Sequence, residues 1–276
     1  MEIKDLLKQT DKLPNIPEVV REIIQALNNP NADYAEISQK VAQDQIISLK
    51  ILRLVNSAYF GLSRKVASID EAVIMLGMGK LKTLVIASGF ANCASNVEGI
   101  DLPLFWSDSF QVAELAKWLA TMTDDNVDAD LAFTAGIIHN IGQLLLHMTQ
   151  PNRAMAIKSL VETSTTTRSE AEIERLGFTT ADAGHALLES WKFPNSLETA
   201  VKYQNNPEEL DETPQLSAVL SLACWINQES KGADTFEEIL QRYPTEIADL
   251  AGIKTAPAEY LAEALSLKSG LDSLAA

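Results

Sequence analysis

Apolar residues recur at three- and four-residue spacing along almost the whole chain, which is the period of an α-helix with one buried face. Val19 and Ile23 are four positions apart in one segment, and Ile47, Ile51 and Leu54 are four and three apart in the next. No segment alternates apolar and polar residues as a half-buried strand does. The pattern therefore predicts an all-α protein of about a dozen helices.

Residues that begin and end helices support this interpretation. Ser68 precedes Glu71 by three positions, the arrangement of a capping box, in which side chains bond the free amides of the first turn. Further N-terminal caps are expected at Asp33 and Thr213, and helix ends at Gly61, Gly77, Gly177 and Gly232.

Acidic side chains dominate only the second part of the chain. The 276 residues carry 22 Lys and Arg against 38 Asp and Glu, a net charge of −16. The first hundred residues hold 11 of each kind, so the whole excess lies beyond them. Because nucleic acids are bound through basic residues, this balance disfavours nucleic-acid binding. The charge shift and the polar turn at 96–102 predict two packed lobes, 1–98 and 99–276.

Two cysteines in 276 residues give no disulfide framework, which favours a reducing compartment. The first residues carry acids where a secretory signal carries bases. Of the two longest apolar runs, 84–91 is too short to span a bilayer and 131–148 is interrupted by His139, Asn140 and Gln143. We therefore expect a cytoplasmic protein with no membrane segment.

His139 and Asn140 are adjacent in an apolar helix expected across 135–143. A His beside a carboxylate is suited to binding a divalent metal that activates water. Asn140 offers only a neutral amide oxygen, which is a weaker ligand. The pair is therefore either a weakened metal site or a buried polar pair that satisfies its own hydrogen bonds, and the missing carboxylate favours the second.

Two other polar segments carry no predicted chemistry. The acidic stretch 124–130 fails as a calcium loop, because Ala129 and Ala135 stand where such a loop needs Gly and Glu. Its acids are instead expected at the start of the following helix, opposite the positive end of the helix dipole. The Ser- and Thr-rich segment 163–167 is expected to be an exposed loop between two helices.

Several motifs together resemble the bacterial HDOD family over about residues 12–225. In the first lobe these are Leu-Pro-Asn-Ile-Pro at 13–17, Val-Ala-Gln-Asp at 41–44, the Asn-Ser-Ala segment at 52–60, and Ser-Ile-Asp-Glu-Ala-Val-Ile-Met-Leu-Gly at 68–77. In the second lobe, 135–146, 184–194 and 203–207 continue the resemblance. The resemblance implies a multi-helical, HD-domain-like bundle that serves as an output or adaptor module in signal transduction.

The resemblance also implies a fold shared with His-Asp metal phosphohydrolases, whose ligands are a leading His, a His-Asp pair and a final Asp. At those positions this chain has Asp108, His139 with Asn140, and Cys224. The basic residue expected after Ile-Gly is Gln143, and the later His positions correspond to Thr180, Gln204 and Asn205. The resemblance thus implies a site that has lost charge for both a metal and a phosphate.

Two functions remain open on the sequence. The favoured one is a non-catalytic bacterial regulatory protein without a cofactor, whose lobes bind an unidentified signalling protein. Asn56, Ser57, Arg64 and Lys65 are the candidate partner surface, although Asn56 and Ser57 are also typical of residues that cap a helix end. The alternative is a metal-dependent phosphohydrolase acting on nucleotides or cyclic dinucleotides, with a divalent metal at Asp108, His139 and Asn140.

Overall fold

Helices make up nearly all the regular structure in the computed structural model, which describes residues 2–9, 16–26, 34–57, 60–62, 64–94, 96–124, 127–210, 215–271 and 274. Within these residues there is no strand, and β-type pairing is limited to one antiparallel bridge between Thr123 and Ile253. The prediction of an all-α fold is confirmed.

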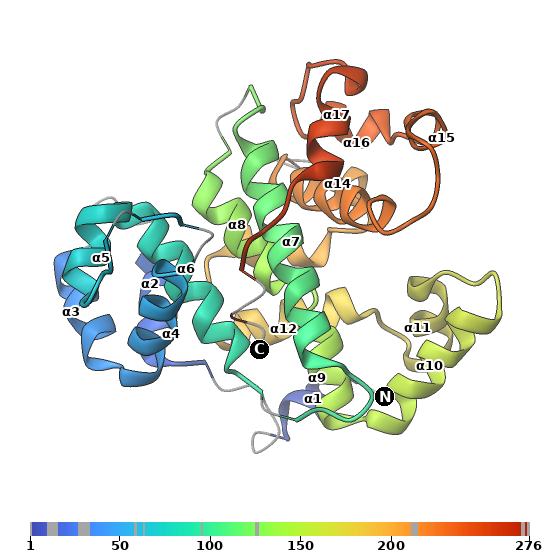
Figure 1. Cartoon of the computed structure of the whole chain (residues 1–276). Coiled ribbons are helices and arrows are strands. Elements are labelled where there is room, and N and C mark those ends of the chain that lie inside the picture. Colours follow the sequence, from blue (N-terminus) through green and yellow to red (C-terminus); the bar gives the residue numbers. More distant parts are fainter. Residues whose placement is uncertain are drawn as a thin grey trace.

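The helices form two groups that are joined by the segment between α6 and α7 (Figure 1). The first group comprises α2 (Glu18–Ala26), α3 (Tyr34–Gln43), α4 (Gln45–Val55), α5 (Ile69–Leu76) and α6 (Met78–Ala91). The second comprises α7 (Leu102–Ala120), α8 (Ala129–Ile138), α9 (Ile141–Thr149), α10 (Pro151–Thr163), α11 (Arg168–Leu176), α12 (Thr180–Ser190), α13 (Asn195–Lys202), η2 (Pro207–Glu209), α14 (Gln215–Glu229), α15 (Phe236–Gln241), α16 (Thr245–Leu250) and α17 (Pro257–Ser266). The short α1 (Ile3–Leu7) packs against α9 and α12 of the second group. The division into lobes at residue 98 stays a prediction.

Of the helix N-caps that the sequence predicts at Asp33, Ser68 and Thr213, the structure describes Ser68. The Ser68 hydroxyl accepts a hydrogen bond from the Glu71 amide at 3.2 Å, but the Glu71 carboxylate bonds the amide of Ala67 rather than that of Ser68. Ser68 is thus an N-cap without the reciprocal half of a capping box. Gly77 and Gly177 have φ of 81° and 83°, which favours glycine. The caps expected at Asp33 and Thr213 lie outside the described residues.

Two glycines allow the central helices to approach closely. A Cβ on Gly136 would lie 2.3 Å from the Cα of Ala113, so α8 meets α7 backbone to backbone. A Cβ on Gly142 would lie 1.9 Å from the carbonyl oxygen of Thr180, so α9 meets α12 in the same way. These two contacts fix the junction between α8 and α9 against α7 and α12, and that junction carries His139.

Polar contacts join the two groups at the start of α8, at the opposite end of that helix from His139. Asp130 at the start of α8 forms ion pairs with Lys82 on α6, at 3.1 Å, and with Lys117 on α7, at 3.6 Å. Lys117 also donates a hydrogen bond to Thr83 on α6. Lys82 therefore holds α6 against α8.

The apolar stretch Ala129–Thr149 is long and apolar enough to cross a membrane by length and composition, and 83% of it is buried inside the protein. It contains α8 and α9, separated by a turn at His139 and Asn140. The expected single helix is therefore two helices. Asp128 caps α8 by accepting from the amides of Asp130 and Leu131, which confirms the acids at this helix start.

Candidate functional site

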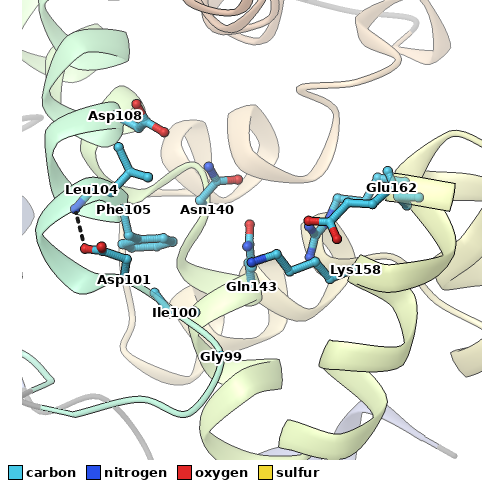
Figure 2. A pocket seen from close by; sticks show the side chains of 12 residues that line it. Gly99, Ile100, Asp101, Leu104, Phe105, Asp108, Asn140, Gln143, Lys158 and Glu162 are labelled. Carbon is cyan, nitrogen blue, oxygen red and sulfur yellow. Dashed lines mark hydrogen bonds between the residues drawn. The ribbon is translucent and has the colours of Figure 1, made fainter.

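One cavity of about 430 Å³ brings together residues that lie far apart in the sequence. Asp108 reaches it from α7, and His139 and Asn140 reach it from the turn between α8 and α9. The positions assigned by resemblance also line it, namely Thr180, Gln204, Asn205 and Cys224. Gln143 lies in an adjoining cavity of about 340 Å³, which Asp108 and Asn140 also line (Figure 2). The structure thus assembles one site from the residues that the resemblance selected.

His139 is the most constrained member of this site. It is 7% exposed, and its Nδ1 lies 2.6 Å from the carbonyl oxygen of Gly136. Because a carbonyl can only accept, Nδ1 carries the proton and Nε2 has a free lone pair. Burial lowers the pKa of His139 to about 4, against smaller opposing contributions from Gly136 and Asp108, so the ring is neutral at pH 7.

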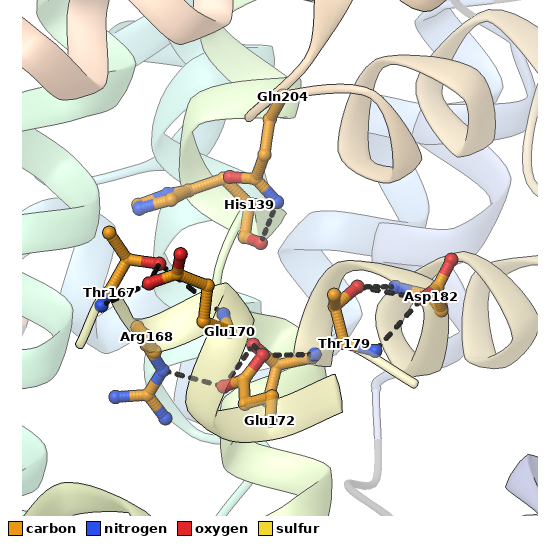
Figure 3. Close-up of polar contacts among 9 residues, drawn as sticks. His139, Thr167, Arg168, Glu170, Glu172, Thr179, Asp182 and Gln204 are labelled. Atoms are coloured by element: carbon orange, nitrogen blue, oxygen red, sulfur yellow. Dashed lines mark hydrogen bonds and ion pairs between the residues drawn. The ribbon is translucent and has the colours of Figure 1, made fainter. Parts of the chain in front are cut away.

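Gln204 holds the backbone of this turn from the other side. Its Nε2 donates to the carbonyl oxygen of His139 at 2.9 Å (Figure 3). The same nitrogen donates to the carbonyl oxygen of Val201, also at 2.9 Å. One buried amide therefore ties the turn after α8 to the end of α13. Gln204 therefore positions the turn that carries His139, and it does so where the resemblance implies a histidine in the phosphohydrolases.

Asp108 does not face the cavity as a free carboxylate. Its Oδ1 lies 2.7 Å from the Nζ of Lys231, which follows α14. Both side chains are partly exposed, 33% for Asp108 and 50% for Lys231, so the pair adds little to stability. Its consequence is electrostatic, because the ammonium offsets the only negative charge that the resemblance places among the ligands.

The other candidate metal ligands, Cys224 and Asn140, add no negative charge to the site. Burial raises the pKa of the Cys224 thiol to about 12, so it stays protonated, and Asn140 is neutral. Among the described residues, no three His, Cys, Asp or Glu side chains are grouped so that they could hold a metal. A neutral imidazole, an amide, a thiol and an ion-paired carboxylate do not fit a divalent metal ion.

A second polar cluster in the cavity was missed by sequence reasoning. Glu172 on α11, whose side chain is 2% exposed, accepts from the Nε of Arg168 at 2.7 Å. It also accepts from the amide of Thr180 at 2.7 Å and from its hydroxyl at 2.9 Å (Figure 3). The four-residue spacing of Arg168 and Glu172 was a signal for an ion pair on one helix face, but nothing local indicated a cavity.

The Ser- and Thr-rich segment before α11 also contributes, contrary to expectation. Thr167 caps α11 in a capping box with Glu170, and it lines the cavity. Residues 164–167 connect α10 to α11, as predicted, but Thr163 is the last residue of α10 and Thr167 is part of the site. The tertiary fold brings it there, because α10 packs on α9 and α11 packs on α10.

The predicted partner surface lies on the other group of helices. Asn56 caps α4, and its amide also bonds both backbone groups of Val66, at 2.7 Å each. Arg64 pairs with Glu71 at 3.2 Å, and Lys65 is exposed. The Ser57 hydroxyl is buried without a hydrogen-bond partner among the described residues. The use of this surface for binding stays a prediction.

Solved structures share the fold of this chain. A protein from Shewanella amazonensis SB2B, provisionally named a phosphohydrolase, is 32% identical, with a TM-score of 0.81, and the match covers 98% of this chain and 96% of that one. An HDOD domain protein of unknown function from Geobacter sulfurreducens is 20% identical, with a TM-score of 0.79, and the match covers 96% and 95% of the two chains. The second likeness supports the fold alone.

Among curated proteins, the chain is similar to the cyclic di-GMP phosphodiesterase CdgJ of Vibrio cholerae. The two are 29% identical over 128 residues, which is 46% of this chain and 28% of CdgJ. The chain spans less than half the length of the curated relatives that it matches. The HDOD domain model matches residues 13–207, which is most of the chain, including α2 to α13 and the turn that carries His139. The chain therefore belongs to the HDOD family.

Proposed function

We propose that this protein is a non-catalytic regulatory module of bacterial signal transduction, acting in the cytoplasm through an unidentified protein partner. One observation carries the proposal: the ammonium of Lys231 lies 2.7 Å from the Asp108 carboxylate. The site therefore has an ion pair where a metal phosphohydrolase needs free negative charge. The helices that surround the site are all present, so the site is suited to bind a ligand or to keep the protein in one conformation.

The name of one protein with a related fold partly supports a signalling role. A protein from Marinobacter aquaeolei VT8 with a related fold carries a provisional name as a signal transduction protein. The candidate partner surface at Asn56, Ser57, Arg64 and Lys65 lies apart from the cavity, so partner and ligand could bind at the same time.

The second candidate is a metal-dependent phosphohydrolase. Its supporting observation is the neutral ring of His139, whose Nε2 carries a lone pair in a cavity that Asp108 also lines. This alternative requires a metal to displace Lys231 from Asp108.

Metal analysis separates the two candidates. Protein purified without a metal-affinity tag, beside His139→Ala and Asp108→Ala variants, is measured for manganese, iron, zinc and magnesium. We expect substoichiometric metal in all three samples and no phosphodiesterase turnover. Stoichiometric metal that is lost in both variants, together with turnover, would overturn the non-catalytic function.

The partner claim is tested by capture from native lysate of the source cells. A specific partner should be retained at moderate salt and lost when Arg64 and Lys65 are both changed to Glu. Capture that is unchanged in this double variant contradicts the placement of the surface, and the absence of any captured protein contradicts the interaction function.

A further inference from the structure

Helix α4 carries aliphatic side chains on its outer face as well as on its inner one. On the inner face, Ile47 and Ile51 are buried in the core of the first group. On the outer face, Ile46 is 64% exposed and Leu49 is 69% exposed. A single exposed aliphatic residue is ordinary, but a helix with apolar residues on both faces is typical of one that is covered on both. The outer face of α4 therefore has the composition of a packed surface.

Two cations complete this outer face, which we call the α4 stripe and define as Ile46, Leu49, Lys50 and Arg53. Because an α-helix has 3.6 residues per turn, these four positions fall within about 100° of its circumference. Relative to the first residue, the others follow at three, four and seven positions. That spacing forms the ridges against which a second helix packs.

The cations of the α4 stripe are not neutralised within the described part of the chain. The side chains of Lys50 and Arg53 form no ion pair or hydrogen bond with a described residue. Burial lowers the pKa of Lys50, and the charge of Arg53 lowers it further, so the two cations repel each other. The stripe therefore favours a partner that supplies negative charge.

The acids nearest to the stripe along the chain have other roles. Asp44 caps α4 by accepting from the amides of Ile46 and Ile47. On α5, Glu71 is in an ion pair, and Asp70 lies in the first turn, at the positive end of the helix dipole. These acids lie at helix starts, whereas the cations of the stripe lie in the second half of α4.

The α4 stripe adjoins the predicted partner surface. Asn56, which caps the end of α4, bonds both backbone groups of Val66, so Lys65 lies beside the end of the helix. Ile74 on α5, which packs on α4, is 79% exposed. The stripe therefore extends the predicted surface along α4 with aliphatic side chains.

Charge disfavours two other occupants of the stripe. In a twofold dimer the same patch faces itself, so Lys50 and Arg53 of both copies would meet without an acid. An anionic membrane attracts the stripe but repels a protein whose net charge is −16. The stripe also has no Trp or Tyr, the residues enriched at membrane interfaces. A protein segment that carries acids is the occupant that fits.

We propose that the α4 stripe is the docking site for an amphipathic helix of a partner protein, in which acidic residues flank an aliphatic face. The aliphatic face covers Ile46 and Leu49, and the acids pair with Lys50 and Arg53. The inference rests on the proposed function and deepens it, because it names the chemistry of the partner that the regulatory module binds.

Fluorescence anisotropy of the full chain tests the site with two labelled helical peptides. Both carry leucine at three- and four-residue spacing, flanked by glutamate in one peptide and by lysine in the other. The glutamate peptide should bind roughly tenfold or more tightly, because its charge complements the stripe. Changing both Lys50 and Arg53 to Glu should reverse this preference. Absence of binding, equal binding of the two peptides, or an unchanged preference in the variant would overturn the inference.

The aliphatic half of the site is tested by changing both Ile46 and Leu49 to Gln. This double variant should bind the glutamate peptide roughly tenfold or more weakly, because apolar surface is no longer buried. Both side chains face solvent, so the fold is kept, which urea unfolding verifies. Ile173→Gln is the matched control, because Ile173 is 52% exposed on α11 of the second group, and it should bind like the unchanged protein. Equal losses in the control and the double variant would overturn the inference.

The other two occupants are tested with the same Ile46 and Leu49 double variant. Cosedimentation with phosphatidylserine and phosphatidylcholine vesicles measures membrane binding, and sedimentation velocity measures self-association. Neither should differ between the variant and the unchanged protein. Vesicle binding or a dimer that is lost in the variant would assign the stripe to lipid or to a second copy and would overturn the inference.

Capture from native lysate separates this inference from the proposed function. A partner that is captured by the unchanged chain and lost by the Ile46 and Leu49 double variant supports both. A partner that is captured equally by both proteins overturns the site and leaves the regulatory function in place. Tight binding of the glutamate peptide without any captured protein supports the site and overturns the interaction function.

Discussion

The Nζ of Lys231 lies 2.7 Å from the Oδ1 of Asp108, although 123 positions of sequence separate helix α7 from the end of α14. The HDOD match ends at residue 207, so Lys231 lies beyond it. A residue outside the matched region therefore sets the charge of the site inside it. The field of this pair reaches His139, whose pKa is raised by Asp108 and lowered by Lys231.

Opposite changes to this pair should move the pKa of His139 in opposite directions. Lys231→Ala removes a positive charge and should raise the pKa of His139, whereas Asp108→Asn removes a negative charge and should lower it. NMR titration of the histidine side chains, with His139 identified by its loss in His139→Gln, measures both shifts. Shifts of the same sign in both variants would contradict this arrangement.

Acid should destabilise the protein through His139. Its folded pKa of about 4 lies below the value of about 6.5 expected in the unfolded chain, so the unfolded state takes up the proton first as pH falls. The contribution of His139 to the free energy of unfolding is complete above a pH of about 6.5. It falls by up to about 3 kcal/mol as the pH drops to about 4, where the folded protein also takes up the proton.

Urea unfolding between pH 4 and 7 measures this loss. His139→Gln, whose amide does not titrate, should flatten the curve in that window. His147 contributes the same sign and remains in the variant, so some slope persists. An identical pH dependence in both proteins would exclude His139 as the cause.

Gly142→Ala should separate α9 from α12. The added Cβ would lie 1.9 Å from the Thr180 carbonyl oxygen, which is backbone and cannot move alone, so we expect a loss of about 2–4 kcal/mol. Gly79→Ala is the control, because no atom beyond its own stretch of helix lies within 4 Å of its Cβ and alanine favours a helix, so a small gain is expected. Urea unfolding compares the free energies of unfolding of the two variants. Equal changes in both would contradict the close approach of α9 to α12 at Gly142.

Asn56→Ala should weaken the first group of helices. The variant removes hydrogen bonds to both backbone groups of Val66 and to the carbonyl of Leu52, which should cost about 2–3 kcal/mol. Lys65→Ala, at an exposed position, should stay within about 0.5 kcal/mol. Thermal and urea unfolding test this difference. A stable Asn56→Ala variant that loses only partner binding would assign Asn56 to the interface instead.

The local pattern was enough to predict the helices. The four- and three-residue spacing of Ile47, Ile51 and Leu54 matched α4, and Asp128 capped α8, because period and capping depend on neighbours in the sequence. The same pattern did not show the break at His139 and Asn140. Both sides of that turn are apolar, and the turn is held by Gln204, which lies 65 positions away.

The sequence by itself determined the fold class, the family and the polar residues Asp108, His139 and Asn140, because these depend on residue type and spacing. Only the tertiary structure decided that Lys231 pairs with Asp108 and that Arg168 and Glu172 line the same cavity. The physical reason is that charge and burial depend on distance in space. Helices α7, α11 and α14 come together only when their apolar faces pack.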